Sequence, residues 1–481
     1  MAEKSNPLRI LAVLYGAAFV AAFNENIINV ALIDIMAEMG VDSVTSQWLV
    51  TGYMIVASIV VASMSFLSRR FSLRALFFTG GGIFLAGSVA AFFAPSFPLL
   101  LAFRLVQAVG TGIFIPTMMG TVLAVSPRQK LGTYLSVGSC CITLGPAFGP
   151  VVSGVMVTAL GWRGIFIPPC VVMAVLVAAG IPMLRNLGEV ERPSFDPLSL
   201  ALSAVGVTAV VFGLTQVTSS IVVALVALAI GVLLVALFAR RQMGLAEPMM
   251  NVRPALKPRF SLAVVMSVIA MMETFSMSVL MPLYFQGALG YNALMSGVFI
   301  LIPIAFNAVA AIVGGRMMDA LGEWPLLPLG FLLILGGQAA VCLLAPGMDI
   351  APVVVAAAVV YAGVGLVMSP AQTAGLKRLS REEHPHGVGM VNTFTQMAGA
   401  LGPSLFVGIL SSGAAGAVAG GATAEVGQAI GFASAALVAS VVGAVGFAIA
   451  AWYAWTVRAG KNDDVRKDEV TRTIKPAPEG E

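Results

Sequence analysis

The sequence carries few charged side chains. Of its 481 residues only 10% are charged, whereas 59% are apolar, and the mean hydropathy is +0.98. A soluble globular chain carries roughly 25% charged residues, because it must cover its surface with groups that water solvates. A chain of this size with so few charges cannot cover a surface that is fully exposed to water. The sequence therefore predicts a protein whose solvent is largely lipid.

Histidine and cysteine are also scarce, which argues against several kinds of site. The two histidines, His384 and His386, fall in a predicted loop, and no G-x-x-x-x-G-K-[ST] phosphate-binding loop is present. The cysteines lie in apolar runs without a metal-ligand spacing; they are Cys140, Cys141, Cys170 and Cys342. We therefore expect no enzyme, no nucleotide-driven pump, and neither a metal nor a cofactor.

Long apolar runs, in contrast, recur throughout the chain. A helix that crosses a ~30 Å hydrocarbon core needs about 20 apolar residues. Fourteen such runs are predicted to span the membrane: residues 10–36, 47–67, 75–94, 97–122, 131–158, 163–184, 197–217, 220–239, 260–286, 293–317, 325–345, 351–374, 386–411 and 428–457.

Lysine and arginine gather on alternate sides of these runs. With the N-terminus in the cytoplasm, 24 of the 26 basic residues fall in cytoplasmic segments. The exceptions are Arg163, in an outside loop, and Arg104, inside the fourth run. Because basic residues concentrate on the cytoplasmic side, this bias predicts an even number of spans with both termini in the cytoplasm.

Several short segments resemble motifs of the major facilitator superfamily. Residues 65–74 and 315–322 resemble two degenerate copies of its cytoplasmic motif A, residues 104–112 its motif B, and residues 138–150 its antiporter motif C. Residues 23–35 resemble the first-helix motif of its fourteen-span drug:proton antiporters, the QacA/EmrB-type (DHA2) group. The resemblance implies an all-α membrane protein with fourteen transmembrane helices, arranged as two six-helix bundles plus two inserted helices.

The same resemblance predicts how the chain is divided. The N-terminal bundle is expected over residues 1–190, the two inserted helices over 191–258, and the C-terminal bundle over 259–457. The charged segment 458–481 contains two prolines and is expected to be a disordered cytoplasmic tail.

Conformational roles also follow from the resemblance, with one departure. Arg69 stands where the first motif A normally has an aspartate, whereas Asp319 keeps the acid in the second copy. Altered gating or coupling is therefore an open question. The residues expected to act in conformational change are Arg70, Gly145, Pro146, Gly149 and Asp319.

Ionisable residues inside a membrane are costly and are usually functional. From a rise of about 1.5 Å per residue, Glu25 and Arg104 lie at nearly the same depth, so an ion pair between them is possible. Glu273 lies near the midplane, about 18 Å along its helix. Because both acids lie on the first helices of their bundles, we expect them to border one central cavity.

Two interpretations of each acid remain open. Glu25 is either a proton carrier or a permanent structural partner of Arg104. Glu273 is either a proton carrier or a neutral acid that is hydrogen-bonded to a helix backbone. Asp34, near the outer interface, is either part of the coupling route or a solvated helix end. The predicted proton-coupling set is therefore Glu25, Arg104, Glu273 and Asp34.

Polar and aromatic residues at similar depths are candidates for a substrate cavity. Each has the alternative of an interhelical hydrogen bond or ordinary packing. The candidates are Asn24, Asn29, Trp48, Tyr53, Gln107, Phe275, Tyr284, Asn392 and Gln396.

The predicted function is proton-coupled antiport, in which amphiphilic drugs or toxic small molecules leave the cell by alternating access. The expected partners are the lipid bilayer, a small amphiphilic substrate and protons, without nucleic acid. The protein is expected to be a monomer in a bacterial cytoplasmic membrane. Two alternatives remain: a dedicated exporter of an endogenous metabolite or lipid, and a non-transporting sensor on the same fold.

Overall fold

The computed structural model describes residues 7–126, 131–186, 196–217, 220–245, 248, 252–380 and 383–474, and all regular elements within them are helices. The α-helices are α1 (Pro7–Asn26), α2 (Leu32–Met39), α3 (Ser43–Ser46), α4 (Trp48–Arg70), α5 (Leu73–Phe92), α6 (Phe97–Val125), α7 (Leu131–Leu160), α8 (Ile167–Met183), α9 (Pro197–Thr215), α10 (Ile221–Gly244), α11 (Pro258–Gly287), α12 (Ala293–Leu321), α13 (Glu323–Leu344), α14 (Ile350–Leu376), α15 (His384–Ala419) and α16 (Ala424–Ile474). Short 3₁₀ turns are η1 (Asn29–Ala31), η3 (Trp162–Phe166), η4 (Arg253–Leu256) and η5 (Ala345–Gly347).

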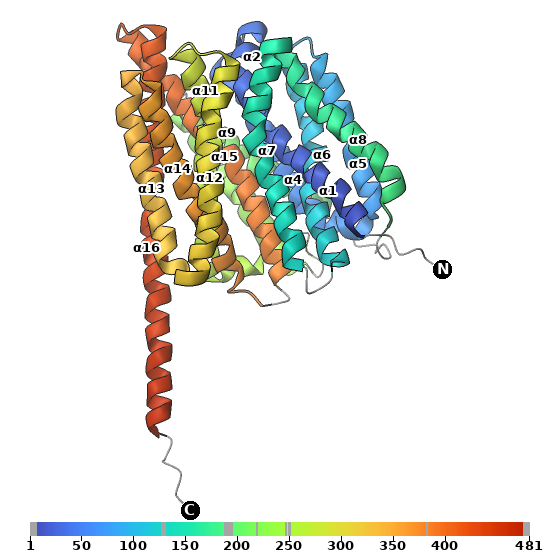
Figure 1. The fold of residues 1–481 in the computed structure, drawn as a ribbon, viewed down its shortest axis with the longest axis vertical. Coiled ribbons are helices and arrows are strands. Elements are labelled where there is room, and N and C mark those ends of the chain that lie inside the picture. The colour runs from blue at the N-terminus through green and yellow to red at the C-terminus, as the bar shows by residue number, and fades with distance from the viewer. Residues whose placement is uncertain are drawn as a thin grey trace, which may run out of the picture.

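The helices are long enough to cross a bilayer. Thirteen helical segments of the described chain have the length and apolar composition of a span, and α7, thirty residues long, fills the place of the remaining predicted span. α1 begins, and α16 extends, at one face of the molecule, which we call the terminus face; α2 lies at the opposite, far face (Figure 1). The predicted all-α, fourteen-helix membrane fold is confirmed.

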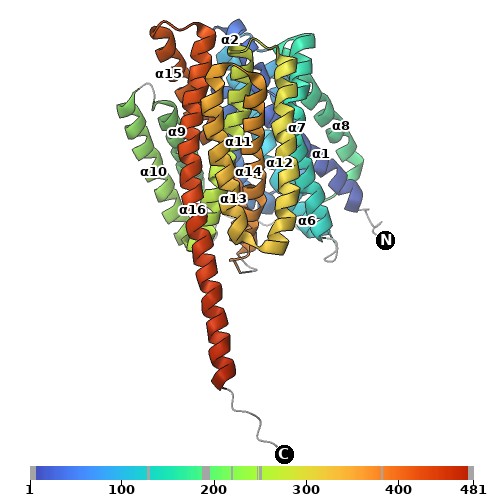
Figure 2. The same ribbon diagram turned by 60° about the vertical axis from the view of Figure 1, so that its left-hand side comes forward.

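The helices form two bundles and a hairpin. α1 and α4–α8 pack together, as do α11–α16, and the bundles meet where α7 packs on α12 and α4 packs on α15. α9 and α10 pair with each other, and α9 also touches α4 and α15 (Figure 2). The hairpin therefore lies on one flank of the bundle interface.

The packing differs between the two faces. At the far face a single apolar cluster joins both bundles; it includes Phe97, Phe166, Phe285, Phe406 and Phe432. Toward the terminus face each bundle has its own cluster, one built from α1 and α5–α8 and the other from α11–α14 and α16. Hydrogen bonds also tie the bundles, between Ser43 and Ser411 (2.6 Å) and between Thr51 and Ser404 (3.0 Å). The bundles are thus sealed together at the far face and packed separately at the other.

The first predicted span, residues 10–36, is not one continuous helix. α1 stops at Asn26, η1 follows, and α2 ends at Met39; the next residue, Gly40, has a φ of 64° and closes the helix in a left-handed cap. Asn26 donates from its side chain to the Ala22 carbonyl (3.4 Å). Asparagine competes in this way with the backbone ladder, which explains a break in an asparagine-rich segment. The break lies one residue beyond Glu25.

The end of the last helix also differs from the prediction. α16 continues to Ile474, beyond the boundary expected at residue 457 and into the segment expected to be disordered. Opposite charges four positions apart, Asp463 with Lys467 and Asp468 with Arg472, favour a helix, and residues 424–475 contain no proline. The boundary expected between residues 190 and 191 lies outside the described residues.

Candidate functional site

A polar network surrounds Arg104 inside the N-terminal bundle. The Arg104 side chain is fully buried; its Nη1 donates to Gln107 Oε1 (2.6 Å) and its Nη2 to the Asn24 carbonyl (3.3 Å). Its guanidinium lies 4.1 Å from the centroid of the Tyr53 ring. Charge-assisted hydrogen bonds and a cation–π contact together offset the cost of burying the charge. The Nε atom of Arg104 has no partner within the described structure.

The network continues through neutral side chains that hold this arrangement. Asn24 Nδ2 donates to the Tyr53 hydroxyl (2.7 Å), and that hydroxyl also bonds to Thr111. Gln107 Nε2 donates to Ser88 Oγ (2.6 Å) on α5. Three helices of the bundle, α4, α5 and α6, are thereby linked with α1 around one guanidinium.

Glu25, on α1, faces the other bundle. Its Oε1 accepts a hydrogen bond of 2.9 Å from Nε2 of Gln396 on α15, and its side chain is 5% exposed. Within the described part of the chain no ion pair joins Glu25 to Arg104, although Arg104 donates to the backbone carbonyl of the adjacent residue, Asn24. Glu25 is therefore placed between a cation of its own bundle and an amide of the other.

Glu273 occupies a different environment. It is fully buried on α11, and its Oε2 accepts from Nε2 of Gln338 (2.6 Å) on α13. Glu273 Oε1 and Gln338 Oε1 both lack a donor within the described structure. Glu273 thus bonds within its own bundle, whereas Glu25 bonds to α15 of the other bundle, and the expectation that both acids border one cavity stays a prediction.

Several predicted cavity residues do gather at the bundle interface. Asn392 and Gln396 are half-buried and lie one turn apart on α15, and Phe275 packs in a cluster with Met54 of α4. Asn29 Nδ2 donates across the interface to Ser278 Oγ (3.0 Å). These groups come from helices of both bundles, so relative motion of the bundles would change their contacts.

Other candidates lie elsewhere. The Trp48 ring packs 6.5 Å from that of Phe212 on α9, and Tyr284 donates to the Ala345 carbonyl (2.9 Å) within the C-terminal bundle. Asp34 is exposed near the far face, and Arg70 is exposed at the end of α4. Asp319 and Pro146 are residues of α12 and α7 whose side chains lie outside the described structure.

The glycines of α7 allow close helix packing. A side chain at Gly145 would collide with the backbone of Ala22 and Phe23, and a Cβ at Gly149 would lie 3.3 Å from that of Asn26. These two glycines therefore fit α7 against α1, and not against the other bundle.

A second pair of glycines forms the seam between the bundles. A Cβ at Gly154 of α7 would lie 2.7 Å from the Ala293 carbonyl of α12, and one at Gly297 of α12 would collide with the Pro150 carbonyl of α7. The absence of side chains on both helices lets α7 and α12 approach at this point.

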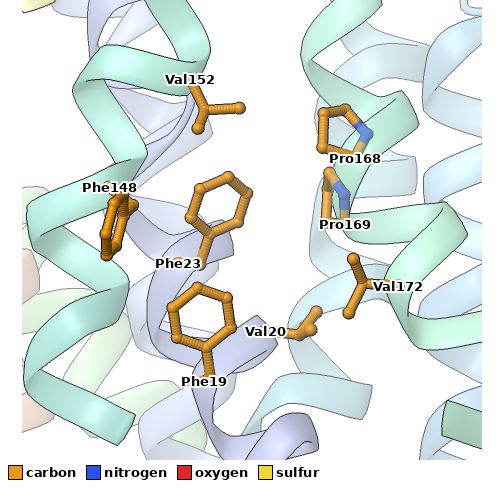
Figure 3. A pocket seen from close by; sticks show the side chains of 8 residues that line it. All are labelled: Phe19, Val20, Phe23, Phe148, Val152, Pro168, Pro169 and Val172. Carbon is orange, nitrogen blue, oxygen red and sulfur yellow. The ribbon is translucent and has the colours of Figure 1, made fainter. Parts of the chain in front are cut away.

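An apolar cavity of about 320 Å³ lies on the flank of the N-terminal bundle (Figure 3). Its walls come from α1, α7 and α8; they are Phe19, Val20, Phe23, Phe148, Val152, Pro168, Pro169 and Val172. On an α1 helix with 100° between residues, Phe23 and Glu25 point about 160° apart. The cavity is therefore on the opposite side of α1 from Glu25.

Ion pairs tie the helices of the C-terminal bundle at the terminus face. Lys257 Nζ lies 2.5 Å from Glu383 Oε2, and Arg378 Nη2 lies 2.6 Å from Glu323 Oε1. The ammonium of Lys257 and the backbone N–H of Ser380 lower the pKa of Glu383 from 4.5 to about 2. The first pair connects the starts of α11 and α15, and the second connects the end of α14 with the start of α13.

Sequence inspection missed several hydrogen-bond partners of the predicted polar residues. Ser88, Thr111, Ser278 and Gln338 each bond to a predicted residue. For Gln338 a signal existed, since it is a polar residue in the middle of an apolar run. Serine and threonine often bond to their own helix backbone, so their sequence positions gave no such signal.

Two helical bundles meet through few helix pairs, and one buried carboxyl, that of Glu25, bonds across their interface. This arrangement defines a multi-pass membrane protein of transporter architecture. The sequence model of the Major Facilitator Superfamily matches residues 14–403, and the chain belongs to this superfamily. The chain is 34% identical to the lincomycin resistance protein LmrB of Bacillus subtilis over 85% of this chain and 86% of that protein. It is 27% identical to a multidrug resistance protein B homolog of Mycobacterium tuberculosis, over 84% and 76% of the two chains.

Solved structures agree on the fold. A bacterial homolog of the human lysosomal transporter Spinster, solved in an inward-facing and unoccupied conformation, superimposes with a TM-score of 0.70 at 14% identity, over 95% of this chain and 98% of that one. At this identity the likeness concerns the fold alone.

Proposed function

We propose that the protein exports amphiphilic antibiotics or similar toxic molecules across the cytoplasmic membrane, in exchange for protons, by alternating access. Relatives that align over most of the chain carry the names of lincomycin and multidrug resistance proteins, which supports the substrate class. The distribution of lysine and arginine supports a cytoplasmic terminus face. On this assignment the conformation is closed to the outside.

The observation that carries the proposal is the contact between Glu25 and Gln396. It joins a buried carboxyl of one bundle to an amide of the other through a single bond of 2.9 Å. Alternating access moves the two bundles against each other. The surroundings of the Glu25 carboxyl therefore change in each cycle, which is what a coupling group requires.

Arg104 supplies the alternative partner. The Nε atom of Arg104 has no partner in the described structure, and it belongs to the same bundle as Glu25. A contact between Glu25 and Arg104 therefore does not require a particular placement of the two bundles. A neighbouring cation favours an ionised carboxyl, whereas apolar surroundings favour a protonated one. In our proposal, Glu25 binds a proton in the outward-open state, carries it as a neutral acid, and releases it inward when it turns toward Arg104.

A single proton is enough for useful export. One charge that crosses 100 mV provides about 2.3 kcal/mol. Since about 1.4 kcal/mol corresponds to a tenfold ratio, this supports a roughly fiftyfold concentration gradient of a neutral substrate. We assign the coupling to Glu25 alone, because Glu273 faces the interior of its own bundle.

The test is dye export in proteoliposomes that contain the purified protein and an imposed pH gradient. We expect a lipophilic dye to move against its gradient, and an uncoupler to stop it. Absence of flux with a broad dye panel would contradict the proposal and favour a sensor, whereas movement of one endogenous lipid or metabolite only would favour a dedicated exporter.

A further inference from the structure

A second site lies on the α9–α10 hairpin, away from the bundle interface. A groove of about 570 Å³ opens where α9 begins and α10 ends, at the terminus face. Its walls are both apolar and basic: Leu198, Leu202, Leu237, Arg240, Arg241, Gly244 and Leu245. Figure 2 shows the hairpin on the outer flank of the molecule, where the lipid would surround it.

One arginine of the groove is held in place by a hydrogen-bonded chain. Arg241 donates to Asp196 through Nε (2.8 Å) and Nη2 (3.1 Å). Asp196 in turn accepts from Ser199 Oγ (2.6 Å), and Ser199 accepts from Gln242 Nε2 (2.7 Å). The guanidinium lowers the pKa of Asp196, which therefore stays ionised. These hydrogen bonds fix the direction of the Arg241 side chain, and its Nη1 has no protein partner in the part of the chain that the structure describes.

The neighbouring Arg240 differs from Arg241 in its contacts. It is exposed, and the described structure gives it neither a hydrogen bond nor an ion pair. Since Asp196 neutralises Arg241, the described walls of the groove carry one net positive charge. A ligand with one negative charge would balance it.

An apolar stripe on α10 leads into these arginines. Val226, Ile230, Leu233 and Leu237 recur at helical spacing on one side of the helix, and all four are exposed. Arg240 and Arg241 continue the same side, one turn further on. The stripe from residue 226 to 237 is about 16 Å long. One leaflet of a ~30 Å hydrocarbon core is about 15 Å thick.

We propose that this groove binds one anionic phospholipid, with its phosphate between Arg240 and Arg241 and an acyl chain along the α10 stripe. The two guanidiniums follow the stripe by one helical turn, as a phosphate follows its acyl chains, and the stripe is about as long as one leaflet of the hydrocarbon core is thick. A phospholipid with a single net negative charge, such as phosphatidylglycerol, satisfies both the charge and the apolar wall. A zwitterionic phospholipid brings an extra cation next to two arginines.

The groove can be closed without disturbing the protein. A Cβ added at Gly244 meets no atom within 4 Å, and Gly244 lines the groove. Gly244→Trp therefore fills the space that the lipid would occupy. Gly336→Trp is the matched control, because Gly336 is exposed on α13 and is equally open.

The experiment is native mass spectrometry of the full-length protein in detergent, titrated with phosphatidylglycerol, phosphatidylcholine or glycerol 3-phosphate. We expect a single tight phosphatidylglycerol site, which Gly244→Trp abolishes and Gly336→Trp leaves intact. Arg240→Gln should weaken it about fivefold, the effect of one arginine near an anionic surface, whereas Arg316→Gln, at an exposed arginine of α12, should not.

Three results would overturn the proposal: equal affinity for phosphatidylcholine, equal occupancy by glycerol 3-phosphate without acyl chains, or unchanged lipid binding in Gly244→Trp. Circular dichroism and gel filtration of each variant show whether it is folded. Dye export is not needed as a readout, so the outcome does not depend on the proposed transport activity.

Discussion

The carboxylate of Glu25 accepts a hydrogen bond of 2.9 Å from the side-chain amide of Gln396, which belongs to the other bundle. Among the described acids buried in the membrane-spanning part, Glu25 bonds across the bundle interface, whereas Glu273 bonds within its own bundle to Gln338. The two acids therefore differ in their hydrogen-bond partners, which is the basis for proposing that Glu25 and not Glu273 carries the proton.

Glu25→Gln should abolish export driven by a pH gradient, with a loss of at least tenfold in initial rate. The amide keeps the size of the side chain and can still bond to Gln396, but it cannot exchange a proton. Exchange of labelled for unlabelled substrate, which needs no proton, should persist. Proteoliposome flux measures both, and a pH-driven rate like that of the unaltered protein would remove Glu25 from the mechanism.

Glu273→Gln should keep export within about twofold. Because Glu273 Oε1 and Gln338 Oε1 both lack a donor, an added N–H on residue 273 offers a donor to the pair, as a protonated acid would. The same flux assay applies, with Glu25→Gln as the comparison. If Glu273→Gln instead stops pH-driven export while the protein remains folded, this second acid is a carrier too.

Arg104→Lys should destabilise the protein by about 1–3 kcal/mol, the range for a buried polar group left without its partner. A lysine ammonium cannot reproduce the two separate guanidinium contacts to Gln107 and Asn24 or the planar stacking on Tyr53. Denaturant or thermal unfolding in detergent measures the change. Arg316→Lys, at an exposed site on α12, is the control and should be neutral.

Gly297→Ala should disfavour the conformation described here. The added methyl group would press on the Pro150 carbonyl at the seam between α7 and α12, in the half where the bundles are sealed. We expect export to fall at least fivefold. Spin labels at Leu160 and Val426, one exposed residue in each bundle, should show a larger population of long distances.

Gly336→Ala is the control for this prediction, since a Cβ there meets no neighbouring atom. Unchanged label distances and full activity in Gly297→Ala would contradict this prediction. They would mean that α7 and α12 accommodate the methyl group, and that the glycine is not required for closure.

The Lys257–Glu383 pair should make stability depend on pH. In the folded protein the pKa of Glu383 is about 2, below its ordinary value of 4.5. The ion pair therefore contributes to folding stability above pH 4.5, and this contribution is lost as the pH falls toward 2. Both groups are partly exposed, so the effect on the unfolding temperature should be small.

Glu383→Gln should lower the unfolding temperature slightly at pH 7 and reduce the further loss between pH 7 and pH 3. Lys257→Met should act in the same way, and the double variant should add nothing more. Additive effects of the two substitutions would show that the pair does not act as a unit.

Much of the fold followed from composition and spacing. Apolar runs of span length, the placement of lysine and arginine, and the segments that resemble superfamily motifs are all local properties of the chain. They predicted the fourteen helices and the family. Arg163, one of the two exceptions to the charge bias, is paired at the far face with Glu38 at 2.5 Å, a contact that no local pattern reveals.

Composition and spacing were enough to predict a membrane protein and to identify the few charged groups within its spans, because the cost of burying a charge depends on the residue and its depth. The hydrogen-bond partners became known only from the packing of the helices: Gln396 for Glu25, Gln338 for Glu273, and the groups that surround Arg104. The direction of a side chain depends on how helices rotate and pack, and contacts between residues 371 positions apart leave no mark in a single sequence.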